Sequence, residues 1–103
     1  MFHLDPNQTE NMNELFEAIV ALQNVDECRD FFRDLCTMQE LIALSRRLQV
    51  AKRLLDGETY EMIRRELPVS SATITRINAA LQYGSGGYSA ALYRKSEGKD
   101  AEE

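Results

Sequence analysis

A row of short polar side chains ending in an arginine points more directly to a surface function than any other part of this sequence. Ser71, Ala72, Thr75 and Arg76 have the spacing of side chains on one side of a helix. Small side chains let a helix approach the floor of a DNA major groove, where arginine can donate two hydrogen bonds to one guanine. The row therefore favours recognition of base edges in duplex DNA by an exposed helix.

Neighbouring residues are suited to holding the sugar-phosphate backbone. Ser70 has the residue type and position of an N-cap for this helix, and amide groups free in a first helical turn attract phosphate. Arg64 and Arg65 precede the row and could contact phosphates, which position a protein on DNA without specifying sequence. The candidate DNA contacts are Arg64, Arg65, Ser70, Ser71, Ala72, Thr73, Thr75 and Arg76.

The elements that must position this row form a predicted helix-turn-helix over residues 59–77. A helix at 59–67 and a second at 71–83 are separated by a short turn that contains Pro68, as this unit requires. A helical hairpin buried in a core is the alternative, but such a hairpin has no reason to carry Ser, Ala, Thr and Arg on its outer side. The small apolar core expected between the two helices consists of Ile63, Leu67, Val69, Ile74 and Ile77.

Helical periodicity continues through the rest of the chain, which predicts an all-α fold. Thr37 and Glu40 have capping-box spacing, and Gly57 has the position of a left-handed C-cap. We expect a flexible N-terminus over residues 1–9, one domain over 10–95 and a disordered charged tail over 96–103. The further predicted helices cover residues 11–22, 25–35, 38–55 and 88–95, and the apolar stripe expected to be buried on the third of them consists of Leu41, Leu44, Leu48, Ala51 and Leu55.

The charge of the chain is unevenly distributed. The 103 residues carry a net charge of −5. Residues 1–36 hold eight acidic and two basic side chains, whereas residues 37–83 hold five acidic and seven basic ones. The local excess of two positive charges favours DNA weakly, and we expect modest non-specific affinity. No segment is long and apolar enough to span a bilayer and the start resembles no signal peptide, so we expect a cytoplasmic protein.

Enzymatic and metal-binding functions find little support. The only histidine is His3, and neither cysteine has a nearby base to activate it. Cys28 and Cys36 lie about 12 Å apart if they share one helix, which is too far for a disulfide, so we expect buried thiols. We predict no catalytic residues, no metal site and no cofactor.

Several separated motifs, in order, resemble the Trp repressor superfamily, and most closely its tryptophan-repressor-related (YerC/YecD) branch. The resemblance covers residues 12–94. The segments that carry it are 31–37, with the sequence FFRDLCT, then Glu40-Leu41, Arg46-Arg47-Leu48, 54–60 with LLDGETY, 72–76 with ATITR, 81–84 with LQYG, and Tyr88.

The resemblance implies a six-helix chain that dimerises by interlocking its outer helices. The two recognition helices of such a homodimer would enter successive major grooves about 34 Å apart and bind a pseudo-palindromic operator. The alternative is that the apolar stripes of the first three helices form the core of a monomer.

The resemblance also marks a possible ligand pocket. Thr37, Arg47 and Arg76 match positions around the tryptophan corepressor of the true Trp repressor. Ile77, however, replaces a glycine where the indole would lie. Three other departures are Ala80 for a serine, Asp34 for an apolar residue and Pro68 for the usual turn glycine. We therefore do not expect tryptophan to bind; another small effector stays open, as does pairing of Arg47 with an acid such as Glu40.

These features together predict a sequence-specific DNA-binding transcriptional regulator. We expect a repressor-like protein that is independent of ligand or does not respond to tryptophan. The alternative is a protein–protein adaptor that keeps the helix-turn-helix shape without affinity for DNA, and the acidic first third of the chain favours that alternative slightly.

Overall fold

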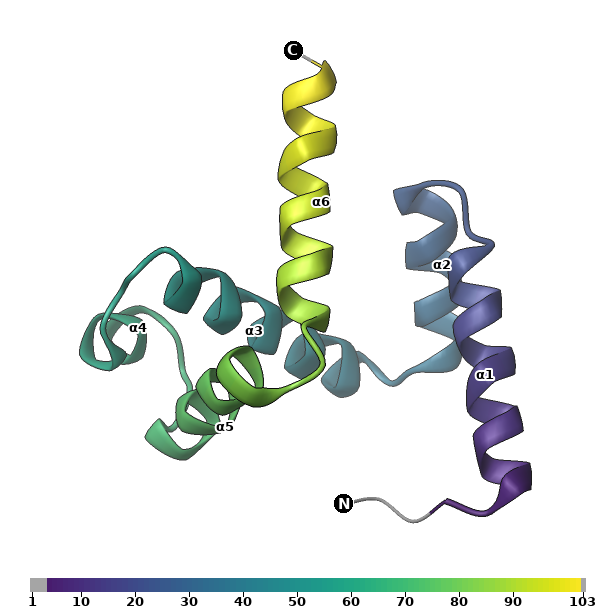
Figure 1. Cartoon of the computed structure of the whole chain (residues 1–103), viewed down its shortest axis with the longest axis horizontal. Coiled ribbons are helices and arrows are strands. Elements are labelled where there is room, and N and C mark those ends of the chain that lie inside the picture. Colours follow the sequence, from purple (N-terminus) through teal and green to yellow (C-terminus); the bar gives the residue numbers. More distant parts are fainter. Residues whose placement is uncertain (1–3, 103) are drawn as a thin grey trace. The chain divides into compact units, whose positions relative to one another are not determined.

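A computed structural model describes the backbone of residues 4–102 and the side chains of residues 4–94. The described residues form six α-helices and no strand, which confirms the predicted all-α class (Figure 1). The helices are α1 (Pro6–Val20), α2 (Val25–Leu35), α3 (Met38–Leu55), α4 (Tyr60–Glu66), α5 (Ser71–Tyr83) and α6 (Gly87–Glu102). No helix among these residues is long and apolar enough to cross a membrane.

The chain divides into two compact units. The N-terminal unit, residues 1–41, contains α1, α2 and the first turn of α3. The C-terminal unit, residues 42–103, contains the rest of α3 together with α4, α5 and α6. The whole predicted helix-turn-helix therefore lies in the C-terminal unit.

Helix α1 begins earlier than the sequence analysis predicted, so residues 6–9 are helical rather than part of a flexible end. The cause is a complete capping box. The Asp5 side chain accepts a hydrogen bond from the Gln8 amide at 2.8 Å, and the Gln8 side chain accepts one from the Asp5 amide at 3.0 Å. Pro6 at the first helical position adds a backbone φ that already suits a helix. Residues 1–3, including His3, lie outside the described residues.

Both ends of α3 match their predicted caps. Thr37 and Glu40 exchange hydrogen bonds of 2.8 and 3.1 Å between the side chain of each and the backbone amide of the other. At the other end Gly57 has φ +90°, and its amide donates to the Leu54 carbonyl while the Glu58 amide donates to the Arg53 carbonyl. This pair of bonds is a Schellman motif, which turns the chain sharply from α3 towards α4.

The core of the C-terminal unit is small and lies where α3, α4 and α5 meet (Figure 1). Ile63, Ile74 and Ile77 are buried, and Leu67 and Val69 are partly buried against them, so the predicted helix-turn-helix core is confirmed. Val50 and Ala51 of α3 complete the core. Through these two residues, α4 and α5 both pack on α3, which is longer than either of them.

The predicted buried stripe of α3 is largely wrong for the single chain. Of its five members only Ala51 is buried, whereas Leu44, Leu48 and Leu55 are exposed. The side chain that is buried next to Ala51 is Val50, which lies outside the predicted stripe. Three leucines of the stripe stay exposed in the described part of the chain, so helical periodicity identified an apolar face without identifying what packs on it.

Helix α6 continues past the predicted end at residue 95, and its backbone is helical through Glu102. Residues 96–102 include Glu, Lys and Ala, which favour helix, and Gly98 costs only about 1 kcal/mol in a helix interior. Tyr88 and Leu92, one turn apart on this helix, pack against the core of the C-terminal unit.

Both cysteines are free thiols, and each is half-buried rather than buried as predicted. Cys28 lies within α2 and Cys36 is its C-terminal cap, so both belong to a short helix that contributes no buried residue in the single chain.

Candidate nucleic-acid interface

The turn between α4 and α5 is built from local hydrogen bonds that its sequence supplies. Thr59 caps α4 by accepting the Met62 amide at 3.2 Å, and Ser70 caps α5 by accepting the Thr73 amide at 3.1 Å. Between the helices, the Val69 amide donates to the Leu67 carbonyl at 2.8 Å across Pro68. This three-residue turn suits the fixed φ of proline, and no described non-glycine residue has a positive φ. Pro68 therefore closes the turn without the conformation that a glycine would supply.

The outer row is exposed along its whole length. Ser71, Ala72, Thr75 and Arg76 are exposed, and Ile74 between them is fully buried. The alternation follows directly from the 3.6-residue period of the helix, because the apolar core holds one side of α5 and leaves the other open. Ala79, one turn further along, is also exposed and extends the row.

Two of the predicted contacts have a structural role as well. The Ser70 hydroxyl is occupied by the cap, and it lies 3.0 Å from the hydroxyl of Thr73, which is half-buried. These two side chains hold the start of α5 in place, whereas the side chains of the outer row carry no such bond in the described structure.

Arg64 and Arg65 lie on α4 and are exposed. Arg65 forms an ion pair of 3.4 Å with Glu61, one turn earlier, and its side chain remains 71% exposed. Exposed pairs of this kind contribute only about 0.3–0.5 kcal/mol, so a phosphate group could replace the carboxylate at little cost.

Arg53 is a residue that the sequence analysis did not select. Its guanidinium pairs with Glu66 on α4 and, at 3.3 Å, with Glu58 in the turn that follows α3. The hydrogen bond to Glu66, together with the charges of both carboxylates, holds the pKa of Arg53 above its ordinary value. Arg53 thus connects the end of α3 to the end of α4. In the sequence, Arg53 stands out only as a basic residue in the last turn of a helix, where the helix dipole favours a positive charge. That position does not indicate the pairs with Glu58 and Glu66.

The three residues of the predicted ligand pocket are in different surroundings. Thr37 belongs to the N-terminal unit, where it caps α3. Arg47 lines a cavity of about 210 Å³ between α3 and the turn before α5, next to Arg46. Arg76 is not among the lining residues of that cavity. Glu40, the proposed acidic partner of Arg47, instead accepts a hydrogen bond from Thr37, and no ion pair of Arg47 occurs among the described side chains.

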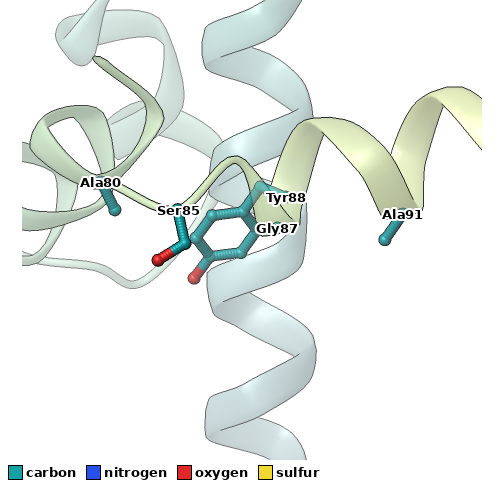
Figure 2. Close-up of a pocket in the computed structure, with 5 residues that line it drawn as sticks. All are labelled: Ala80, Ser85, Gly87, Tyr88 and Ala91. Carbon is teal, nitrogen blue, oxygen red and sulfur yellow. The ribbon is translucent and has the colours of Figure 1, made fainter. Parts of the chain in front are cut away.

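A second cavity, of about 350 Å³, lies at the junction of α5 and α6. Its lining is mostly apolar, and in Figure 2 the two hydroxyl-bearing side chains of this pocket, Ser85 and Tyr88, lie at the start of α6. Ala80 of α5 faces it, at the position where the resemblance expects a ligand-binding serine. Without that hydroxyl, α5 offers the cavity no side-chain hydrogen bond from this position.

The sequence model of the family described as Trp repressor protein matches residues 10–96, which is most of the chain. The chain belongs to the Trp repressor family. Members of this family are DNA-binding regulators of transcription and not enzymes. The family match includes α4, the turn and α5, so the exposed row lies inside the segment that defines the family.

Individual relatives agree with this assignment. The uncharacterised protein YerC of Bacillus subtilis is 40% identical over 94 residues, which are 91% of this chain and 90% of that protein. A crystal structure of a candidate Trp repressor from Staphylococcus aureus is 46% identical, with a TM-score of 0.79 over 84% of this chain and 87% of the other. A TrpR-like protein from Eubacterium eligens is 42% identical, with a TM-score of 0.80 over 86% and 92%. The predicted Trp-repressor-like fold and its YerC branch are confirmed.

Proposed function

We propose that this protein is a sequence-specific, repressor-like regulator that binds a pseudo-palindromic operator as a homodimer and needs no tryptophan. Arg76 and Thr75 contact base edges, Ser71 and Ala72 permit close approach to the groove, and Arg64 and Arg65 contact phosphates. The observation that carries the proposal is the exposed outer row, held by a capped helix on a buried core.

Electrostatics supports the placement of DNA on this side. The described acidic side chains nearest in sequence to α5 are already engaged, since Glu61 pairs with Arg65 and Glu66 with Arg53. No described ion pair involves Arg64 or Arg76. Both guanidinium groups are therefore available to phosphate or guanine without the loss of an existing pair.

The apolar surface of the single chain supports a homodimer. Val20 is 84% exposed and Val25 71% exposed in the N-terminal unit, and Phe16 and Leu35 are also exposed there. Helices α1 and α2 contain no buried residue. Single exposed apolar residues are common, but two helices without any buried side chain need a partner surface to be stable. A second copy would also supply the second recognition helix that a two-fold operator requires.

Independence from tryptophan follows from Ile77. Its side chain is 4% exposed and forms part of the core, at the position where the corepressor-binding repressor has a glycine. An indole at this position would have to displace the smaller, buried side chain of Ile77, which would open the core of the helix-turn-helix. The cavity at Arg47 also does not include Arg76, so the two arginines do not line one cavity there.

Selection from a random duplex library tests the proposal. The purified protein is incubated with the library at low salt without tryptophan, and bound DNA is sequenced after several rounds. We expect a pseudo-palindrome with half-sites about one helical turn apart, and a dimer mass by light scattering at micromolar concentration. Tryptophan should leave the affinity for the selected site unchanged.

Failure would be equally clear. Absence of any enriched sequence, with or without tryptophan, would reject the proposal and favour the adaptor. A monomer mass would reject the two-fold operator. A selected site that is bound only in the presence of tryptophan would show that Ile77 moves aside, and would reject independence from this ligand.

A further inference from the structure

The cavity between α3 and the turn before α5 has the charge of an anion site. Arg46 and Arg47 contribute guanidinium groups from α3, and Ser70 and Thr73 contribute hydroxyl groups from the start of α5. No acidic residue lines it. Two positive charges at a small cavity without a carboxylate attract a negatively charged group from solution.

Arg46 strengthens this interpretation because it is half-buried. A half-buried side chain has less conformational freedom to lose when it binds a ligand. The described ion pairs engage Arg29, Arg53 and Arg65 but neither Arg46 nor Arg47. An anion in the cavity would pair with guanidinium groups that no described carboxylate engages.

The start of α5 provides a second positive contribution from another element. The Ser70 hydroxyl accepts the Thr73 amide, but the amides of Ser71 and Ala72 precede the first helical hydrogen bond, which Ile74 donates to Ser70. A thirteen-residue helix carries a partial positive charge at this end. The arginines on α3 therefore face the same cavity as the positive end of the recognition helix.

The size of the cavity limits the ligand. At about 210 Å³ it is below the roughly 300–1,000 Å³ of sites that enclose drug-sized molecules. A phosphate group is small, and its oxygen atoms accept hydrogen bonds from several directions. Two of these oxygens can accept the paired N–H groups of one arginine. The lining, with two guanidinium groups, two hydroxyl groups and no carboxylate, favours an anion over an uncharged ring of similar size.

We infer that this cavity binds a phosphate group. Arg46, which is not part of the outer row, donates hydrogen bonds to that group. The group has two possible sources, a backbone phosphate of DNA bound at α5 or a free phosphate. The first source rests on the proposed function, because it requires DNA beside the outer row. The second does not require DNA at all.

The test compares Arg46→Gln with Arg33→Gln, a matched control on α2 in the N-terminal unit. Arg33 is exposed and takes part in no described ion pair. Glutamine keeps much of the arginine stem, so the packing of Arg46 along α3 is largely retained, and circular dichroism melts confirm that each variant folds. Arg47→Gln serves as the second variant at the same cavity if Arg46→Gln melts below the assay temperature.

The first arm measures affinity for the selected duplex and for an unrelated duplex over a range of salt. For a DNA phosphate, Arg46→Gln weakens both duplexes by the same factor, about tenfold for each protomer that contacts the DNA. It also lowers the slope of log affinity against log salt by about 1.8 for the homodimer, because each of the two protomers loses one phosphate contact that contributes about 0.9. Arg33→Gln leaves that slope at the parental value.

The second arm titrates inorganic phosphate into the protein without DNA and follows the backbone amides of residues 70–73 by NMR. For a free phosphate, these amides shift saturably in the parent and in Arg33→Gln but not in Arg46→Gln. A changed slope without saturable shifts assigns the site to DNA, and saturable shifts without a changed slope assign it to free phosphate. If Arg46→Gln matches Arg33→Gln in both arms, the cavity is no phosphate site. A parent that binds no DNA rejects the proposed function, and the second arm then decides the cavity by itself.

Discussion

Arg76→Ala is the sharpest test of how this protein recognises DNA. Arg76 is exposed on α5 and belongs to no described ion pair, so its removal leaves no orphaned charge. We therefore expect the free energy of unfolding to change by no more than about 0.5 kcal/mol. Any larger loss in DNA binding then reports on the contact itself and not on the fold.

The expected loss follows from the chemistry of one bidentate contact. A guanidinium paired with guanine contributes about 1–3 kcal/mol of discrimination. That range corresponds to a rise in dissociation constant of roughly 5- to 160-fold for each half-site. A duplex in which one guanine of one half-site is replaced isolates a single contact, because the other half-site remains intact.

The assay is a double-mutant cycle in which one change is in the protein and the other in the DNA. Fluorescence anisotropy gives dissociation constants for the parent and Arg76→Ala on the selected duplex and on the duplex with the replaced guanine. The parent should lose 1–3 kcal/mol on base replacement, as estimated above for a bidentate contact, and Arg76→Ala should lose almost nothing further. Arg64→Ala is the control, since loss of a phosphate contact weakens all duplexes alike. The opposite result is that the parent and Arg76→Ala lose the same binding free energy whichever base of the half-site is replaced. That result would show that the outer row does not determine specificity.

Three further predictions concern stability, each measured by urea unfolding at one protein concentration. Ile74→Ala removes a fully buried side chain from the helix-turn-helix core and should cost about 2–5 kcal/mol, against about 0.5–1.5 for Ile74→Val; equal costs would contradict the packed core. Gly57→Ala meets no atom within 4 Å but forces φ +90° on alanine, so about 1–2 kcal/mol should be lost, whereas Gly87→Ala should be tolerated. Hydrogen bonds from the backbone amide and then the side chain of Thr37 hold the pKa of Glu40 below its ordinary value of 4.5. Ionised Glu40 therefore stabilises the fold above that value, and the benefit is lost as pH falls through the lowered pKa. Glu40→Gln should lose less stability than the parent between about pH 6 and pH 3.5, and parallel losses would exclude a charge effect at this cap.

Local structure was largely determined by the sequence. The caps at Thr37, Gly57 and Ser70 depend on hydrogen bonds between residues at most five positions apart, so residue type and spacing were sufficient to predict them. The same holds for the core side of α5, because a helix of known period that presents Ile74 to a core must present Arg76, two residues on, to the opposite side. Asp5 and Gln8 show that a capping box can also be missed when a polar stretch is taken for a flexible end.

What packs against each face was decided only by tertiary structure. Periodicity marked an apolar stripe on α3, but Val50 and not Leu48 reaches the core, because α4 and α5 approach α3 from one particular direction. The cavity at Arg46 depends on the same approach, since it joins a helix to a turn more than twenty residues away in the chain. Arg53 reached Glu66 for the same reason. Hydrophobic burial has no direction of its own, so a sequence determines which surfaces are apolar, and the path of the backbone determines which of them meet.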